Sequence, residues 1–187
     1  PAGNSDIAMI GRRFSLLLRH FAVLMLLVLP GALSHAQVNS ESQLKAAFLV
    51  NFLKYIEWPA SSTSTATICL FGRDTLGAYL SSYEGRAIGG RELHIRRING
   101  PDQVAECQLL FIPDTEEARF GAVLRWVENS PVLTVSDAEV FTRQGGAIAL
   151  VRAEGRLQFD INIDVLNRAG LKPHSQMMRL ARQVVGS

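Results

Sequence analysis

The chain is poor in the residues that build stapled, fibrous or disordered proteins. Its 187 residues include two cysteines and seven prolines, and 7% of them are aromatic. Two cysteines exclude a disulfide-rich scaffold, and 15 glycines with seven prolines are too few for a fibrous chain. A hydrophobic fraction of 48% excludes a chain that stays disordered for lack of apolar residues. The composition is therefore that of a globular protein.

The N-terminal segment has the layout of a secretory signal peptide. Basic residues come first and are followed by an unbroken apolar run and then by small residues: Arg12, Arg13, Arg19, the run 21–29, Ser34 and Ala36. We expect residues 1–36 to be cleaved after Ala36, with Met9 as the natural start and residues 1–8 as extra upstream sequence. The alternative is an uncleaved membrane anchor, although the apolar run is shorter than the roughly 20 residues that span a bilayer.

The predicted mature chain is electrically neutral. Removing 36 of the 187 residues leaves 151, and with them go three of the 19 basic and one of the 17 acidic residues, so 16 of each sign remain. Neutrality together with export argues against nucleic acid as a partner. The locally basic stretch is interpreted as a solvated strand face: Arg86, Arg91, His94, Arg96 and Arg97.

Export also decides how the two cysteines are interpreted. Cys69 and Cys107 both lie in apolar, strand-like runs, and an oxidising compartment favours a disulfide between them. Two buried free thiols are the alternative. A metal site is not expected, because two cysteines without a CxxC motif or a histidine at ligand spacing do not complete a zinc shell.

Strand and helix signals alternate along residues 37–187, which predicts one α/β domain. A first helix is expected to begin at Ser40, with Gln43 completing a capping box, and to end at Pro59. Short apolar runs predict the strands, which are 68–71, 93–97, 109–112 and 131–135. Two further runs, 147–152 and 157–163, predict a C-terminal β-hairpin, so the sheet is mixed and mostly parallel, with flanking helices.

Four more helices complete the predicted domain, and two of them are short, one ending at about Ser82 and one starting at Asp164. Asp114 and Glu117 repeat the capping pattern at the start of a helix that ends near Asn129. The last helix is expected over 175–184. Gly145 and Gly146 precede a strand rather than follow one, so they are interpreted as a turn and not as a phosphate-binding loop.

The sequence contains no recognisable catalytic set. It has no GxSxG motif, and nothing local brings Ser136 and Asp137 together with His94 or His174 as a triad. The carboxylates Glu154, Asp160 and Asp164 are interpreted as a solvated face of the hairpin, with Asp164 capping a short helix. We therefore predict that the protein is not an enzyme and carries no cofactor.

Five residues are the candidates for contact with a partner or ligand: Glu57, Trp58, Arg73, Asn162 and His174. Trp58 is a typical interface anchor if exposed and a core residue if buried. Arg73 follows a strand at the crevice where α/β sheets bind ligands, although a turn and cap explain it equally well. His174 is a lone histidine in a loop. Phe120 and Phe141 are further anchor candidates if exposed.

Residues 44–52 (LKAAFLVNF) and 54–59 (KYIEWP) resemble the opening signature of the YfiR family of secreted bacterial proteins. Later matching pieces follow in the same order, and they are 68–74 (ICLFGRD), 89–91, 107–112, 131–137 (PVLTVSD), 145–146, 159–164 and 168–181. The resemblance covers residues 41–184 and implies a periplasmic regulator without catalytic activity. In the best understood member, the regulator holds the periplasmic part of an inner-membrane diguanylate cyclase inactive, which limits cyclic di-GMP and biofilm formation.

The resemblance also implies further partners and a redox response. An outer-membrane lipoprotein with a peptidoglycan-binding domain sequesters the best understood member, which forms dimers and is sensitive to redox state. Cys69 and Cys107 match one of its cysteine pairs, whereas a second pair expected around 147–152 is absent. We therefore predict a periplasmic, dimeric inhibitor of a diguanylate cyclase. The alternative is a periplasmic small-ligand binding or sensor module.

Overall fold

The computed structural model describes residues 32–59, 64–73 and 75–186. The basic and apolar parts of the predicted signal peptide and the link 60–63 lie outside these residues. The chain divides into two units, Pro1–Ser40 and Glu41–Ser187, and the fold described below is that of the second. None of the helices in the described part of the chain combines the length and the hydropathy needed to span a bilayer.

Helix α2 (Ala32–Tyr55) begins earlier than the sequence predicted. The predicted N-cap at Ser40 is wrong, because residues 32–40 contain neither Pro nor Gly and the helical backbone continues through them. From Glu41 onward, residues spaced three and four apart are buried, including Ala46, Leu49 and Leu53. The helix ends at Tyr55, and strand β1 (Ile56–Glu57) then pairs antiparallel with β9 (Lys172–Pro173).

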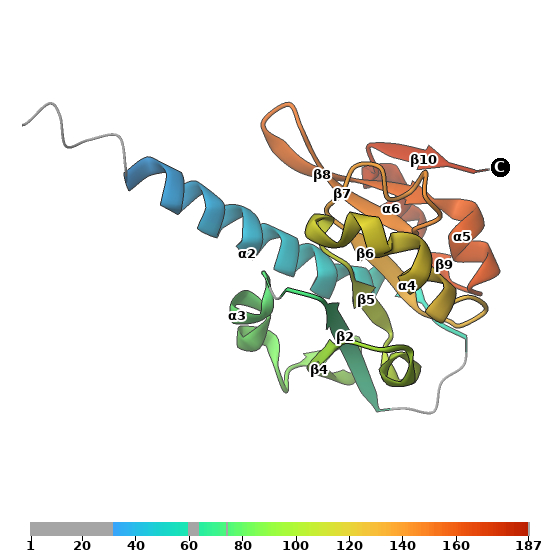
Figure 1. Cartoon of the computed structure of the whole chain (residues 1–187). Coiled ribbons are helices and arrows are strands. Elements are labelled where there is room, and N and C mark those ends of the chain that lie inside the picture. Colours follow the sequence, from blue (N-terminus) through green and yellow to red (C-terminus); the bar gives the residue numbers. More distant parts are fainter. Residues whose placement is uncertain (1–31, 60–63, 74, 187) are drawn as a thin grey trace, which may run out of the picture. The chain divides into compact units, whose positions relative to one another are not determined.

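In the described part of the chain, the main sheet has eight strands in the order β10-β8-β7-β6-β5-β2-β4-β3 (Figure 1). Their bounds are β2 (Thr65–Phe71), β3 (Ala87–Ile88), β4 (Arg91–Ile98), β5 (Leu109–Phe111), β6 (Leu133–Ser136), β7 (Ile148–Ala153), β8 (Arg156–Asn162) and β10 (Gln183–Val185). The β3–β4 and β7–β8 pairs are antiparallel and the other pairs are parallel. The prediction of a mixed, mostly parallel sheet with a late β-hairpin is confirmed.

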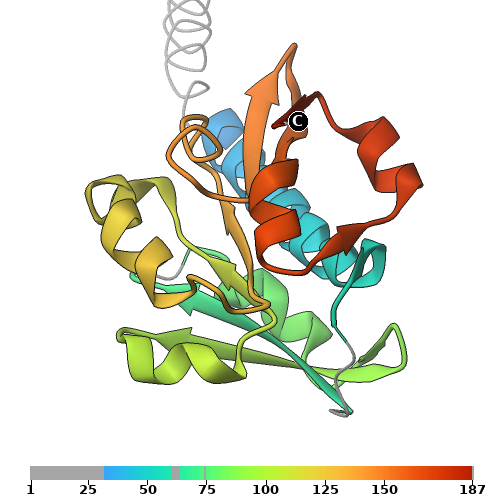
Figure 2. The same ribbon diagram turned by 90° about the vertical axis from the view of Figure 1, so that its right-hand side faces the viewer.

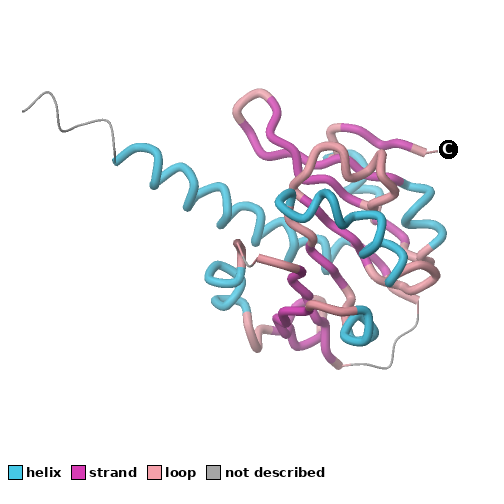
Figure 3. The backbone as a smooth tube through the Cα atoms, in the orientation of Figure 1, coloured by secondary structure: helices cyan, strands magenta, loops and turns pink. Residues whose placement is uncertain are grey.

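Both faces of the sheet are covered, which explains why the central strands β2, β5 and β6 are buried nearly throughout. In β2, Ile68 and Leu70 face a core beneath α2, whereas Cys69 and Phe71 face a second core beneath α4. Strand β5 alternates in the same way. Figure 3 shows the strands in the middle of the domain with helices on both sides. The result is a three-layer α/β sandwich.

The remaining helical elements are short, and they are α3 (Gly77–Leu80), η1 (Ser81–Tyr83), η2 (Pro101–Glu106), η3 (Asp114–Arg119), α4 (Phe120–Trp126), α5 (Ile163–Arg168) and α6 (Ser175–Leu180). The predicted cap at Asp114 is wrong, since no side chain caps η3. The N–H of Asp114 instead donates to Asp137 Oδ1 at 2.8 Å, across 23 residues of sequence. The carboxylate that completes this turn therefore comes from the loop after β6.

The predicted terminal helix over 175–184 is too long. Helix α6 ends at Leu180, and residues 183–185 form β10, which pairs parallel with β8. Figure 2 shows the red C-terminal segment beside the orange β7–β8 hairpin. The strand forms because the edge of β8 offers unpaired backbone groups to the end of the chain.

Candidate functional site

Two of the five predicted contact residues meet at one corner of the domain. There the His174 Nε2 lies 3.2 Å from Glu57 Oε1, and both side chains remain accessible, at 43% and 63%. The His174 backbone N–H donates to the carbonyl of Tyr55 at 2.9 Å, and the two rings lie edge to face with centroids 6.3 Å apart. We call Tyr55, Glu57, Trp58 and His174 the β1–β9 corner. It presents one acidic, one titratable and two aromatic side chains.

Trp58 is partly buried and packs against the core beneath α2. The Arg91 guanidinium lies over its ring, 5.3 Å from the centroid, which is a cation–π contact. The indole Nε1 is buried and has no hydrogen-bond partner among the described residues. Trp58 is therefore half core residue and half surface residue, and neither of the two predicted alternatives describes it fully.

An apolar groove lies between α2 and α6 and reaches the β1–β9 corner at Tyr55. It has a volume of about 100 Å³. Phe48, Phe52 and Phe159 form its aromatic wall, with ring centroids 5.3 to 5.8 Å apart. Leu180 stands at its edge with 68% of its surface exposed, which is high for a large apolar side chain. We call this feature the α2–α6 groove.

The side chain of Asn162 makes two hydrogen bonds within the domain. Its Oδ1 accepts the N–H of Val165 at 3.1 Å and so caps α5, and its Nδ2 donates to the carbonyl of Thr142 at 3.0 Å. The prediction that Asp164 caps this helix is wrong, because Asp164 lies one residue inside its start. An asparagine at the N-cap satisfies an otherwise unpaired helical N–H.

Arg73 is exposed at the carboxyl end of β2, apart from the other four residues. The chain leaves β2 for β4 on one side and returns to β5 on the other, so a crevice is expected between the ends of β2 and β5. The side chain of Glu116 lies against Gly72 at this end of β2, where a Cβ on residue 72 would clash with Glu116 Oε1. Gly72 has a φ of 71°, which also favours glycine.

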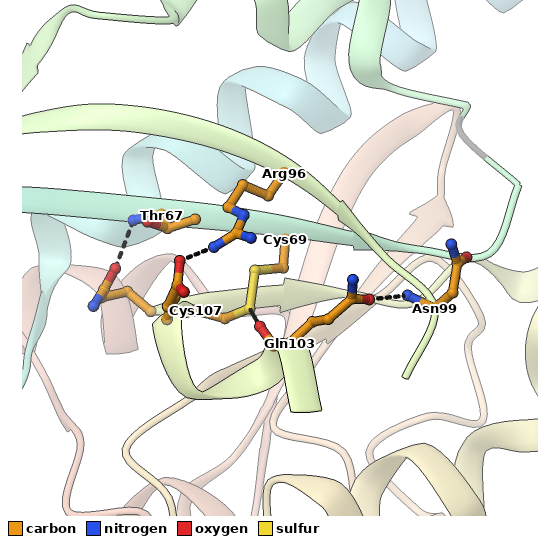
Figure 4. The surroundings of a disulfide bond; sticks show 8 residues. Thr67, Cys69, Arg96, Asn99, Gln103 and Cys107 are labelled. Atoms are coloured by element: carbon orange, nitrogen blue, oxygen red, sulfur yellow. Dashed lines mark hydrogen bonds and ion pairs between the residues drawn. A yellow bond between two sulfur atoms is a disulfide. The ribbon is translucent and has the colours of Figure 1, made fainter. Parts of the chain in front are cut away.

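Cys69 and Cys107 form the predicted disulfide, with Cα atoms 5.7 Å apart (Figure 4). Both residues are buried in the core beneath α4. Polar contacts hold the surrounding segments in place. Gln108 Oε1 accepts the N–H of Thr67 at 2.5 Å, and Gln103 Oε1 accepts the N–H of Asn99 at 2.8 Å. The bridge therefore joins β2 to the segment before β5 within a well-packed region.

The sequence did not predict the charged cluster that lies at the carboxyl end of the sheet. Lys45 Nζ lies 2.8 Å from Asp137 Oδ2 and 3.1 Å from Glu41 Oε1, and Arg152 Nη1 lies 2.5 Å from Glu41 Oε2. The hydrogen bond from Lys45 lowers the pKa of Glu41. Burial alone would lower the pKa of Lys45, but its hydrogen bonds to Asp137 and Glu41 outweigh burial and raise it. The Glu41–Lys45 spacing of four residues was the available signal.

The prediction that Asp160 lies on a solvated face is wrong. Asp160 is 3% exposed, and Arg182 donates two hydrogen bonds to its carboxylate, at 2.8 and 2.5 Å. Arg182 lies 22 residues later in the sequence, in the segment that leads into β10. No local pattern signals that pairing.

Burial or position explains four other residues that were considered only as conditional interface anchors or as members of a triad that the sequence does not favour. Phe120 and Phe141 are fully buried against each other, with centroids 4.8 Å apart, so they are not interface anchors. Ser136 is also fully buried and accepts the N–H of Ala138. His94 faces Glu84 on a different part of the sheet. The described residues contain no group of His, Cys, Asp or Glu that could hold a metal ion.

Comparisons with known proteins agree with this architecture. The family model described as YfiR/HmsC-like matches residues 42–182. A solved structure titled as the ABC domain in complex with L-Trp from Streptococcus pneumonia is similar at a TM-score of 0.52 and 13% identity, over 75% of this chain and 60% of that one. The solved structure of a conserved domain protein from Vibrio cholerae is similar at a TM-score of 0.55 and 8% identity, over 77% of this chain and 60% of that one. The chain thus spans about 60% of each structure, and these low identities show the fold alone.

Proposed function

Because the chain belongs to the YfiR/HmsC-like family, we propose that it is a periplasmic, non-catalytic regulator that inhibits a membrane diguanylate cyclase by protein–protein binding. Such inhibition lowers cyclic di-GMP and with it biofilm formation. The family match carries this proposal, because the family is one of periplasmic regulators in cyclic di-GMP signalling rather than of enzymes. The match over 42–182 takes in nearly the whole described domain.

An inhibitor of this kind needs a rigid surface that binds the inactive state of its partner better than the active state. Moving a two-state partner from mostly active to mostly inactive requires a preference of several kcal/mol. A few aromatic and aliphatic anchors usually supply such energy. The two-faced core and the buried disulfide make the scaffold rigid, which suits this role.

The surface that best fits the partner combines the β1–β9 corner with the α2–α6 groove. It gathers exposed Leu180, a half-buried Phe48 and the Glu57–His174 pair on one continuous stretch. Apolar anchors bordered by polar groups are typical of protein interfaces. We propose that the periplasmic domain of the cyclase occupies it. The outer-membrane lipoprotein would then release the cyclase by competing for the same surface, and a homodimer would form elsewhere.

The alternative, a small-ligand module at the sheet crevice near Arg73, has less support. The carboxylate of Glu116 already occupies the space above Gly72, and it lies 3.1 Å from Arg119 Nη1. An ion pair of the protein itself therefore lies against Gly72, next to Arg73.

The first test measures cellular cyclic di-GMP in the native host. We expect deletion of the gene to raise cyclic di-GMP, and expression of the full chain to restore the low level. Expression without residues 1–36 is expected to fail, because the protein would not be exported. An unchanged cyclic di-GMP level after deletion would refute the proposal.

The second test addresses the surface. Leu180→Glu places a charge at the edge of the α2–α6 groove, where 68% exposure means that folding is little affected. We expect this variant to lose repression while keeping its melting temperature. Ala122→Glu is the matched control, because Ala122 is exposed on α4, which covers the other face of the sheet. Equal repression by both variants would show that the partner binds elsewhere.

A further inference from the structure

A second hollow, larger than the groove, lies between α4 and α5. Its volume is about 300 Å³, at the lower end of the range for small-molecule sites. The turn at Gln144 and Gly145 closes one side, and the floor is the start of β6. No residue that lines it also lines the α2–α6 groove or belongs to the β1–β9 corner. The proposed function above makes no use of this pocket.

The pocket has both apolar and polar walls, the latter including Asn129 and Gln144, and its floor carries one buried hydroxyl. Leu124, Val127, Val132 and Val165 supply the apolar surface. Thr134 is 2% exposed, and its Oγ1 accepts the N–H of Ala147 at 3.0 Å. Among the described residues nothing accepts the hydrogen of this hydroxyl, so it remains available to an acceptor atom inside the pocket.

Two arginines stand on the pocket wall without a carboxylate partner. Both Arg125 and Arg168 are exposed, and among the described residues neither forms an ion pair, which is also true of Arg143 and Arg179. Arg125 Nη1 lies 4.0 Å from the position that a Cβ on Gly121 would take, so its guanidinium folds back over α4 toward the pocket. Glu128 also lines the pocket, which leaves a net positive charge there.

The helix dipole explains only part of the placement of Arg125 and Arg168. Each lies in the last turn of its helix, where the helix dipole favours a cation. The dipole accounts for each arginine singly. It does not require that both guanidinium groups border the same pocket, as they do.

The pocket walls are held in place before any ligand arrives. The Asn162 side chain caps α5 on one wall and binds the carbonyl of Thr142, two residues before the turn that forms another. That turn is further fixed by a hydrogen bond of 2.9 Å from Gly146 N to the carbonyl of Phe141. Preorganisation of this kind reduces the entropy lost on binding.

We propose that this pocket binds a small organic carboxylate with an apolar body. The body lies against Leu124, Val132 and Val165, the carboxylate meets Arg125 and Arg168, and Thr134 donates to an acceptor on the buried part of the ligand. Guanidinium groups suit carboxylates because they donate two parallel hydrogen bonds. Binding at this site is independent of the cyclase and is tested without it.

The experiment uses the protein purified after expression of the full chain. Isothermal titration compares three acids (3-phenylpropionate, hexanoate and cyclohexanecarboxylate) with their neutral amides, and amide NMR shifts locate the site. We expect at least one acid to bind saturably, at least tenfold more tightly than its amide, with shifts at Leu124, Thr134, Gly145 and Val165. The double variant Arg125→Gln with Arg168→Gln is expected to remove the preference for the acid.

Two controls separate this result from a general effect of charge or folding. Arg179→Gln removes an exposed arginine on α6 and is expected to leave binding unchanged. Thr134→Val keeps the shape of the floor and is expected to leave the affinity for these three acids within about threefold, because their apolar bodies carry no acceptor for the Thr134 hydroxyl. Absence of saturable binding by all three acids, equal affinity for acid and amide, or shifts confined to the α2–α6 groove would each overturn the proposal. A failure of cyclase repression would leave it standing.

Discussion

Replacing Arg182 by glutamine should destabilise the domain more than its surface position suggests. The Asp160 carboxylate is 3% exposed and receives two hydrogen bonds from the Arg182 guanidinium, at 2.8 and 2.5 Å. The hydrogen bonds that Arg182 donates to Asp160, with a smaller contribution from Glu139, raise the pKa of Arg182 above its usual range, so the cation stays charged at every relevant pH. Without it, a buried carboxylate has no counter-charge.

The expected cost is about 2–3 kcal/mol. Breaking a buried ion pair by removing one partner costs about 3–5 kcal/mol, and the 29% exposure of the Arg182 side chain lets water relieve part of that cost. For a domain of this size, one kcal/mol corresponds to about 2–4 °C in the melting temperature, so a fall of roughly 5–10 °C is expected.

Urea unfolding at pH 7 measures this directly. The double variant Asp160→Asn with Arg182→Gln should be more stable than Arg182→Gln alone, since it no longer buries an unpaired charge. Arg179→Gln on α6 serves as the control and should stay within about 0.5 kcal/mol of the parent. If Arg182→Gln also lies within 0.5 kcal/mol of the parent, the reasoning about this pair is refuted.

Three further predictions concern the disulfide, the charged cluster and one glycine. Reduction of Cys69–Cys107, which closes a loop with a sequence separation of 38, should cost about 4 kcal/mol and lower the melting temperature, and the double alanine variant should lose that sensitivity to reductant. The lowered pKa of Glu41 means that its contribution is complete above the unfolded pKa of 4.5 and is lost as pH falls through the folded value. Glu41→Gln should therefore cost up to about 1 kcal/mol at pH 7 and progressively less as the pH falls below 4.5, as measured by urea unfolding at pH 7 and at a series of lower pH values. Gly146→Ala should cost about 1–3 kcal/mol in the same assay, because the new Cβ would clash with the buried Phe141 ring. Gly155→Ala is the control: its Cβ would meet no atom within 4 Å, so it tests the effect of positive φ alone.

Local sequence patterns were sufficient wherever a residue's environment depends on its near neighbours. Apolar runs bounded by Gly and Pro located most of the strands, and the alternation of strands with helices identified the mixed sheet and its hairpin. The Cys69–Cys107 pairing was predicted from there being two cysteines in a chain with a predicted export signal. The family signature supplied the regulatory function, which no single side chain indicates.

Tertiary structure decided every feature in which the partner is distant in the sequence. Asp160 becomes a buried ion because Arg182 returns to it, and Asp114 needs no cap of its own because Asp137 reaches its N–H. Residues 183–185 become a strand because the edge of β8 satisfies their backbone groups. The α4–α5 pocket exists because two short helices end side by side. Helical and strand periodicities report on which side of an element is buried, whereas the identity of the group that lies opposite depends on how the whole chain packs.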